Sequence, residues 1–85
     1  MIIKLYGANR CHKTQHYLRF FKAHQLDFVF LDVEKNEDHA KELRALYTTG
    51  RLNFPTIALD SKKLRNPSDD ELLKWIDKLK QACHS

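Results

Sequence analysis

Residues 1–14 read MIIKLYGANRCHKT, and this stretch decides the fold. Its first six residues are apolar and rich in β-formers, which predicts a buried strand that ends at Gly7. Helical spacing follows over residues 11–25, so we expect Cys11 at or just before a helix N-terminus. A strand, a glycine-containing loop and a helix in this order are typical of the α/β class.

Strand and helix patterns alternate along the rest of the chain. Residues 26–33 predict a second strand, and Asn36 is expected to cap a second helix that stops at Gly50. Residues 56–59 and 62–65 predict two further strands, the last an edge strand protected by its charges. A closing helix completes the order β-α-β-α-β-β-α, a four-stranded mixed sheet flanked by three helices. The first βαβ unit is expected to form a parallel pair with a right-handed crossover.

The helix patterns also predict caps and core faces. Ser68 to Glu71 is a capping box, and acidic residues early in the second helix suit the helix dipole: Glu37, Asp38 and Glu42. The residues expected to form the apolar faces of the three helices are Tyr17, Leu18, Phe20 and Phe21; Ala40, Leu43, Leu46 and Tyr47; and Leu72, Leu73, Trp75, Ile76 and Leu79.

Composition narrows the class of protein. With 85 residues we expect one domain over residues 1–85, and 42% hydrophobic content suffices for a core. No signal-peptide pattern, no apolar run of about 20 residues and only two cysteines predict a cytoplasmic, membrane-free protein with free thiols. The net charge is +4, but the basic residues are interleaved with acidic ones along the chain. No motif for reading nucleic acids accompanies them, so nucleic-acid binding is not expected.

Cys11 is the residue that points to chemistry. Free backbone amides and the dipole at a helix N-terminus stabilise a thiolate, the reactive form of cysteine. Arg10, His12 and Lys13 add positive charge, and Thr14 occupies the position of the second cysteine in Cys-x-x-Cys motifs. The Thr14 hydroxyl is placed to donate a hydrogen bond to the thiolate. The alternative is that Cys11 is merely a small buried hydrophobic residue.

A metal site is the second alternative for this region. His12 and His16 are four residues apart and near Cys11, but a structural zinc site needs four closely spaced ligands. His24, His39 and the Cys83-His84 pair lack that spacing, so no metal is predicted.

The layout resembles a glutaredoxin over residues 2–80. The resemblance rests on the Ile-Lys-Leu-Tyr-Gly strand end, Cys11-x-x-Thr14, the Gly-Arg-Leu-Asn-Phe-Pro stretch at 50–55, and Ser68-Asp69. It implies a thioredoxin-like fold with a cis Phe54-Pro55 bond beside the reactive cysteine. Such a turn would leave the Phe54 amide and carbonyl free to pair with an extended thiol peptide.

The resemblance also implies roles for glutathione. Arg51 would hold its glycine carboxylate, and the amides at Ser68 and Asp69 would hold its γ-glutamyl end. The chain departs from the family at two places. Ala8 stands where a lysine is usual, and Lys13 could replace the missing charge. Asn66-Pro67 stands in place of Gly-Gly before the last helix. The Cys-Gly-Phe-Ser motif of the cluster-binding branch is not present.

We therefore predict a monomeric monothiol oxidoreductase that reduces glutathione mixed disulfides on protein partners. Catalysis is assigned to Cys11 and Thr14, and binding to Lys13, Arg51, Phe54, Pro55, Ser68 and Asp69. Glutathione or a similar thiol is the co-substrate, and no cofactor is tightly bound. Cys83 in the tail is a poor resolving partner. The alternatives are a non-catalytic binding module, an iron–sulfur cluster carrier and, last, an arsenate-reductase-like protein, for which the chain is short.

Overall fold

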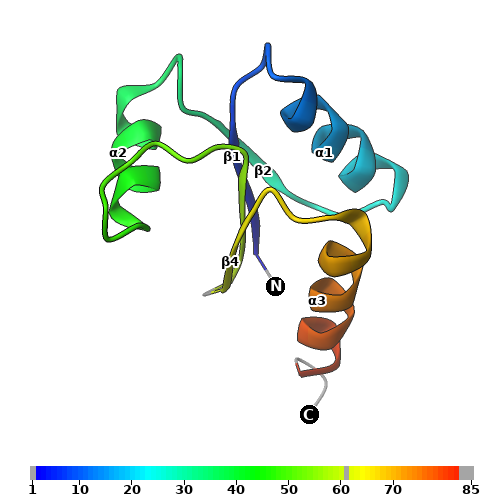
Figure 1. The fold of residues 1–85 in the computed structure, drawn as a ribbon. Helices are drawn as coiled ribbons and strands as arrows, with labels where there is room; N and C mark the ends of the chain where they lie inside the picture. The colour runs from blue at the N-terminus through cyan, green and yellow to red at the C-terminus, as the bar shows by residue number, and fades with distance from the viewer. Residues whose placement is uncertain (1, 61, 83–85) are drawn as a thin grey trace.

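The helices and strands follow the predicted order in the computed structural model, which describes residues 2–60 and 62–82 (Figure 1). Predicted positions at Met1, Ser61 and 83–85, including Cys83, lie outside the described residues. The elements are β1 Ile3–Gly7, α1 His12–Ala23, β2 Val29–Asp32, α2 Glu37–Ala45, β3 Thr56–Leu59, β4 Lys62–Arg65 and α3 Asp69–Ala82.

The four strands form one mixed sheet in the order β2-β1-β3-β4. β1 and β2 are parallel, as a βαβ unit requires, whereas β3 runs antiparallel to both β1 and β4. The predicted α/β fold and the edge position of β4 are confirmed. Three of the four residues of β4 are cationic and exposed, which discourages pairing with another chain.

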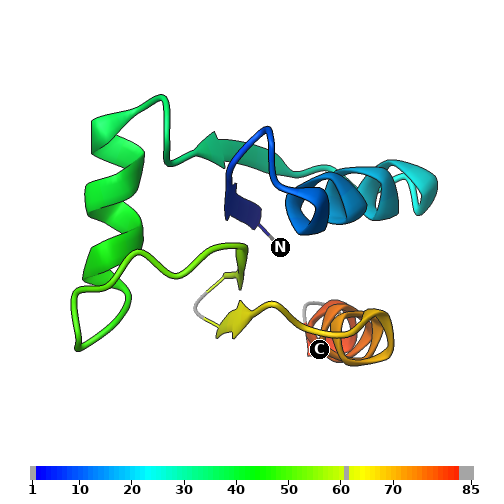
Figure 2. The same ribbon diagram turned by 45° about the horizontal axis from the view of Figure 1, so that its top comes forward.

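The helices cover the sheet on both faces: α2 lies on one side and α1 and α3 lie on the other (Figures 1 and 2). Side chains alternate across a strand, so Ile3 and Leu5 enter the core under α1 and α3, whereas Tyr6 enters the core under α2. Burial of these apolar side chains on two faces is the main force that holds the layers together.

Helix α2 begins as predicted. The Asn36 side-chain oxygen accepts hydrogen bonds from the amides of Asp38 (2.9 Å) and His39 (3.3 Å), which confirms its role as N-cap. Glu42 does not act on the helix dipole as predicted, because it lies beyond the first turn. It accepts a hydrogen bond from the Tyr6 hydroxyl at 2.6 Å and thereby joins α2 to the sheet.

Several predicted elements are longer than the observed ones. Helix α2 ends at Ala45, before the expected stop at Gly50. Helix α1 spans 12–23 rather than 11–25, because Cys11 is its N-cap and Gln25 adopts a left-handed backbone with φ 54°. The second strand spans 29–32 rather than 26–33, because β2 is an edge strand and pairs only with residues 4–7 of β1. Leu26 and Phe28 still pack against the core from outside the strand.

Leu73 was wrongly assigned to the core face of the closing helix. Leu72 is fully buried and Ile76 is 4% exposed, whereas Leu73 is 38% exposed. Each residue turns a helix by about 100°, so a side chain next to a fully buried one points along the flank. The buried face of α3 is thus narrower than the run of apolar residues.

Strand register brings three loops to one end of the sheet. β1 ends at Gly7, and the preceding residue, Tyr6, pairs with Thr56 at the start of β3. Thr56 also pairs with Arg65 at the end of β4. The loop before α1, the loop before β3 and the segment before α3 therefore meet there, although they lie far apart in the sequence.

Gly7 allows helix α1 to start close to the end of β1. A Cβ atom at this position would lie 2.7 Å from the Thr14 Cγ2 atom and closer still to its Oγ1 atom. Thr14 is fully buried, so it has no space into which to retreat. The glycine therefore allows the first turn of α1, which follows Cys11, to pack directly against the end of β1.

Candidate functional site

Cys11 lies at the N-cap of α1 with extended backbone angles, φ −83° and ψ 125°. Its amide donates to the Ala8 carbonyl at 2.9 Å, and its carbonyl accepts the first helical bond, from Gln15, at 3.0 Å. The thiol is half-buried and forms no disulfide. Cys11 therefore faces the unpaired amides of the first turn of the helix.

The surroundings of Cys11 favour its thiolate. Burial acts to raise the pKa of the thiol, but the nearby Thr14 amide and hydroxyl and the Lys13 amide favour the thiolate and lower it, as does the Lys13 charge. The net effect is a pKa below the ordinary value. Thr14 also accepts a hydrogen bond from the Ala8 amide (3.2 Å) through its Oγ1 atom, which orients the hydroxyl.

The other basic neighbours are less available to the thiolate. Arg10 pairs with Glu34 through two nitrogens, with the shorter contact at 2.6 Å, so much of its charge is neutralised. His16 contacts Asp69 at the start of α3 (Nε2 to Oδ1, 2.7 Å). His12 is exposed. Lys13 is thus the cation that acts most directly on Cys11.

The Phe54-Pro55 loop is braced on both sides. Its peptide bond is cis. The Thr56 hydroxyl donates to the Asn53 carbonyl (2.6 Å), and the Pro55 carbonyl accepts from the Asn66 amide (3.0 Å). Within residues 2–60 and 62–82, the backbone N–H and C=O of Phe54 have no hydrogen-bond partner. These two groups remain free to bind an extended segment.

The remaining predicted binding residues lie at the start of α3 and in the segment that precedes β3. Ser68 caps α3: its Oγ atom accepts from the Glu71 amide at 3.2 Å. Asp69 is the first residue of α3 and is held by His16. Arg51 is exposed in the segment between α2 and β3, and among the described residues it has no ion-pair partner.

Sequence reasoning missed a hydrogen-bond network beneath these residues. Periodicity placed Tyr17 in the core, where it is indeed 3% exposed, but its hydroxyl also donates to the Pro67 carbonyl at 2.5 Å. The Asn66 side-chain oxygen lies 3.2 Å from the same hydroxyl. A tyrosine on a buried helix face needs a partner for its hydroxyl, which was the one available signal.

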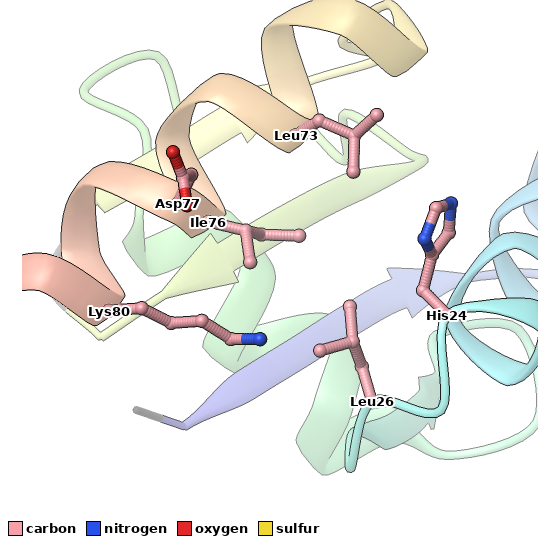
Figure 3. A pocket seen from close by; sticks show the side chains of 6 residues that line it. All are labelled: His24, Leu26, Leu73, Ile76, Asp77 and Lys80. Atoms are coloured by element: carbon pink, nitrogen blue, oxygen red, sulfur yellow. The ribbon is translucent and has the colours of Figure 1, made fainter.

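Two surface hollows among the described residues lie away from the predicted site residues. One of about 150 Å³ lies between Leu26 and the exposed flank of α3, where Leu73 and Lys80 flank Ile76 (Figure 3). Another of about 360 Å³ lies beside Lys4 and Glu42 on the α2 side of the sheet. Neither is lined by a predicted site residue.

The described part of the chain contains neither a metal-ligand cluster nor a membrane-spanning helix. No group of three or more His, Cys, Asp or Glu side chains there could hold a metal ion. Within the same residues, no helix has the length and apolar character needed to cross a membrane.

This arrangement defines a thioredoxin-like protein with a cysteine at the start of its first helix. Solved structures have the same fold. A glutaredoxin from Archaeoglobus fulgidus is similar at TM-score 0.73 and 19% identity, over 87% of this chain and 84% of its own. Thioredoxin 1 from Thermosipho africanus is similar at TM-score 0.71 and 21% identity, over 100% of both chains. A thioredoxin-like protein is similar at TM-score 0.69 and 21% identity, over 85% of this chain and 96% of its own.

The family follows from a direct match. The glutaredoxin family model matches residues 3–64, so the chain belongs to the glutaredoxin family. No curated protein matches it significantly. Family and fold together support a thiol–disulfide oxidoreductase role.

Proposed function

We propose that the protein is a monothiol oxidoreductase that reduces glutathione mixed disulfides through Cys11. The observation that carries the proposal is the half-buried Cys11 thiol, whose pKa is lowered mainly by the Thr14 and Lys13 groups that oppose its burial. A thiolate held at a helix N-terminus is the chemical requirement for attack on a disulfide.

The first step transfers the glutathionyl group to the enzyme. The Cys11 thiolate attacks the glutathione sulfur of a protein–glutathione disulfide, a new S–S bond forms, and the protein leaves as a thiolate. Negative charge moves from Cys11 to the leaving sulfur, which takes up a proton from solvent. Thr14 is the second catalytic residue in this proposal, because its hydroxyl stabilises the Cys11 thiolate before attack and again when it is released.

The second step restores the enzyme. A glutathione thiolate attacks the glutathione sulfur bound to Cys11, which forms glutathione disulfide and releases the Cys11 thiolate. One free glutathione is consumed in each cycle, because the other half of the glutathione disulfide comes from the mixed disulfide. The attacking glutathione thiolate supplies the electron pair of the new S–S bond, and the pair of the broken bond leaves with Cys11. Thr14 carries no sulfur, so no disulfide between Cys11 and residue 14 can displace the bound glutathione.

Glutathione would bind across the meeting point of the loops. The unpartnered Phe54 backbone within the described chain supports pairing with the cysteinyl part of glutathione, beside Pro55. Lys13 and Arg51 supply positive charge for its glycine carboxylate. The amides at Ser68 and Asp69, at the start of α3, would receive the γ-glutamyl carboxylate.

Partners and compartment belong to the same proposal. The physiological partners are glutathione and disulfide-bearing proteins, the protein acts as a monomer with no tightly bound cofactor, and a reducing cytoplasm maintains the cycle. Nucleic acids and membranes play no part in it.

The test begins with the pKa of Cys11 in a Cys83→Ser background, measured by thiolate absorbance against pH. Glutathione disulfide is then added, and mass spectrometry follows a one-to-one adduct, with Cys11→Ser as control. A pKa below about 8.5 and an adduct that requires Cys11 support the proposal. An ordinary pKa without an adduct would contradict it and favour a binding module, whereas a coloured dimer after anaerobic expression would favour a cluster carrier.

A further inference from the structure

Three segments of the proposed site are joined through one stretch, residues 66–69. The Asn66 amide donates to the Pro55 carbonyl at 3.0 Å, so this stretch supports the proline loop. Asp69 begins α3 and contacts His16 of α1 at 2.7 Å. The position of residues 66–69 therefore sets the spacing between Pro55, α3 and the helix that carries Cys11.

Asn66 needs external support to hold its conformation. Its φ is 48°, in the left-handed region that costs free energy for any residue other than glycine, although Asn tolerates it better than most. Pro67 follows and offers no amide donor. The local backbone thus provides few hydrogen bonds of its own, and side chains must supply them.

Tyr17 supplies that support from α1. Its hydroxyl carries one proton, which it donates to the Pro67 carbonyl at 2.5 Å, and the Asn66 side chain lies at 3.2 Å. Burial, with the carboxylates of Asp69 and Glu71 adding to it, raises the pKa of Tyr17 to about 12. The phenol therefore remains a hydrogen-bond donor throughout the physiological range.

We propose that Tyr17 is a positioning residue of this site: its hydroxyl fixes the Asn66-Pro67 segment to α1 and so holds the proline loop and the start of α3 at the spacing that glutathione requires from Cys11. The inference rests on the proposed function, since it concerns recognition of the same substrate. The Tyr17 hydroxyl bonds to the Asn66-Pro67 segment and is not among the groups that shift the pKa of Cys11, so its effect is expected on recognition and not on the thiol.

Two reactions of Cys11 separate these effects. Iodoacetamide alkylation reports the reactivity of the thiolate and needs no binding groups. Reaction with glutathione disulfide forms the Cys11–glutathione bond, releases one glutathione thiolate and depends on recognition. The ratio of the second rate to the first, in a Cys83→Ser background, therefore measures positioning.

Tyr17→Phe is expected to lower this ratio about fivefold, the effect of one lost hydrogen bond of ordinary strength. The matched control is Tyr6→Phe, which removes a hydroxyl bonded to Glu42 on the opposite face of the sheet and should leave the ratio unchanged. Asn66→Gly keeps the left-handed backbone and removes the side chain, so it should lower the ratio about twofold; it tests the proposal even where Tyr17→Phe folds poorly.

The outcomes are distinct. An unchanged ratio in both site variants overturns the positioning role, as does a parallel fall of both rates, which would mean that Tyr17 acts through the helix and its thiol. A protein with intact Tyr17 that forms no glutathione adduct, or that reacts equally well with 2-hydroxyethyl disulfide, overturns the proposed function and the inference with it.

Discussion

Gly7→Ala tests how closely the reactive helix is packed against the sheet. The added Cβ atom would lie 2.7 Å from Thr14 Cγ2 and 3.1 Å from Thr14 Cβ, with Oγ1 nearer than either. Contacts below 3.0 Å are not sustained, and Thr14 is fully buried, so the start of α1 must move. The same movement shifts the Thr14 amide and hydroxyl, which lower the pKa of Cys11.

The magnitude follows from two opposing terms. Overpacking of a buried site costs about 1–3 kcal/mol of unfolding free energy. Replacing glycine by alanine restricts the unfolded chain and returns about 0.4–1 kcal/mol. We expect a net loss of about 1–2 kcal/mol, measured by urea denaturation. For a chain of 85 residues this lowers the midpoint temperature by about 5–15 °C.

A double variant identifies the cause. Gly7→Ala with Thr14→Ala removes both close atoms, so it should be less destabilised than the sum of the two single variants by about 1 kcal/mol. Gly50→Ala is the matched control: its φ is 68° and nothing lies within 4 Å, so its cost is conformational and no Thr14 change relieves it. A stable Gly7→Ala variant, or strict additivity with Thr14→Ala, would refute the packing argument.

Four further predictions concern Cys11, Tyr17 and the buried face of α3. Thr14→Val removes the hydroxyl that lowers the pKa of Cys11, so thiolate absorbance should titrate at higher pH than in the parent protein, and an unaltered titration would exclude this role. Because that pKa is lower in the folded than in the unfolded chain, stability should rise as pH increases through the interval between the two values, and Cys11→Ser should abolish the rise. The pKa of Tyr17 is raised to about 12, so its contribution to stability is complete below its unfolded value near 10 and is lost as pH rises toward 12; urea titrations of Tyr17→Phe should lack that loss. Leu72→Ala should cost about 2–5 kcal/mol of unfolding free energy and Leu73→Ala clearly less, since Leu73 is 38% exposed, and equal costs would contradict the observed face of α3.

Local signals accounted for most of the fold. Asn36 and Ser68 were predictable as helix caps because a short polar side chain at a helix start bonds to amides two or three residues away, a purely local interaction. Leu73 was misjudged because its neighbours in sequence do not reveal where the sheet lies. Glu42 was misjudged for the same reason, since its partner Tyr6 is 36 residues away.

The candidate site divides in the same way. Cys11, Thr14 and Lys13 could be found from sequence because they belong to one helical turn, and the geometry of that turn is set by the local chain. Phe54 and Pro55 were found through a family resemblance, and the availability of the Phe54 backbone within the described residues became visible only in the structure. Their roles in glutathione binding remain predictions.

The amino-acid sequence by itself determined the order of the strands and helices, their caps and the cysteine at the start of the first helix, because these depend on contacts within a few residues. Only the tertiary structure decided that Gly7 lies against Thr14 and that Tyr17 holds Pro67 across 50 residues of chain. Such contacts arise from strand register and layer packing, and no periodicity along the chain encodes the partner of a hydroxyl on a buried helix face.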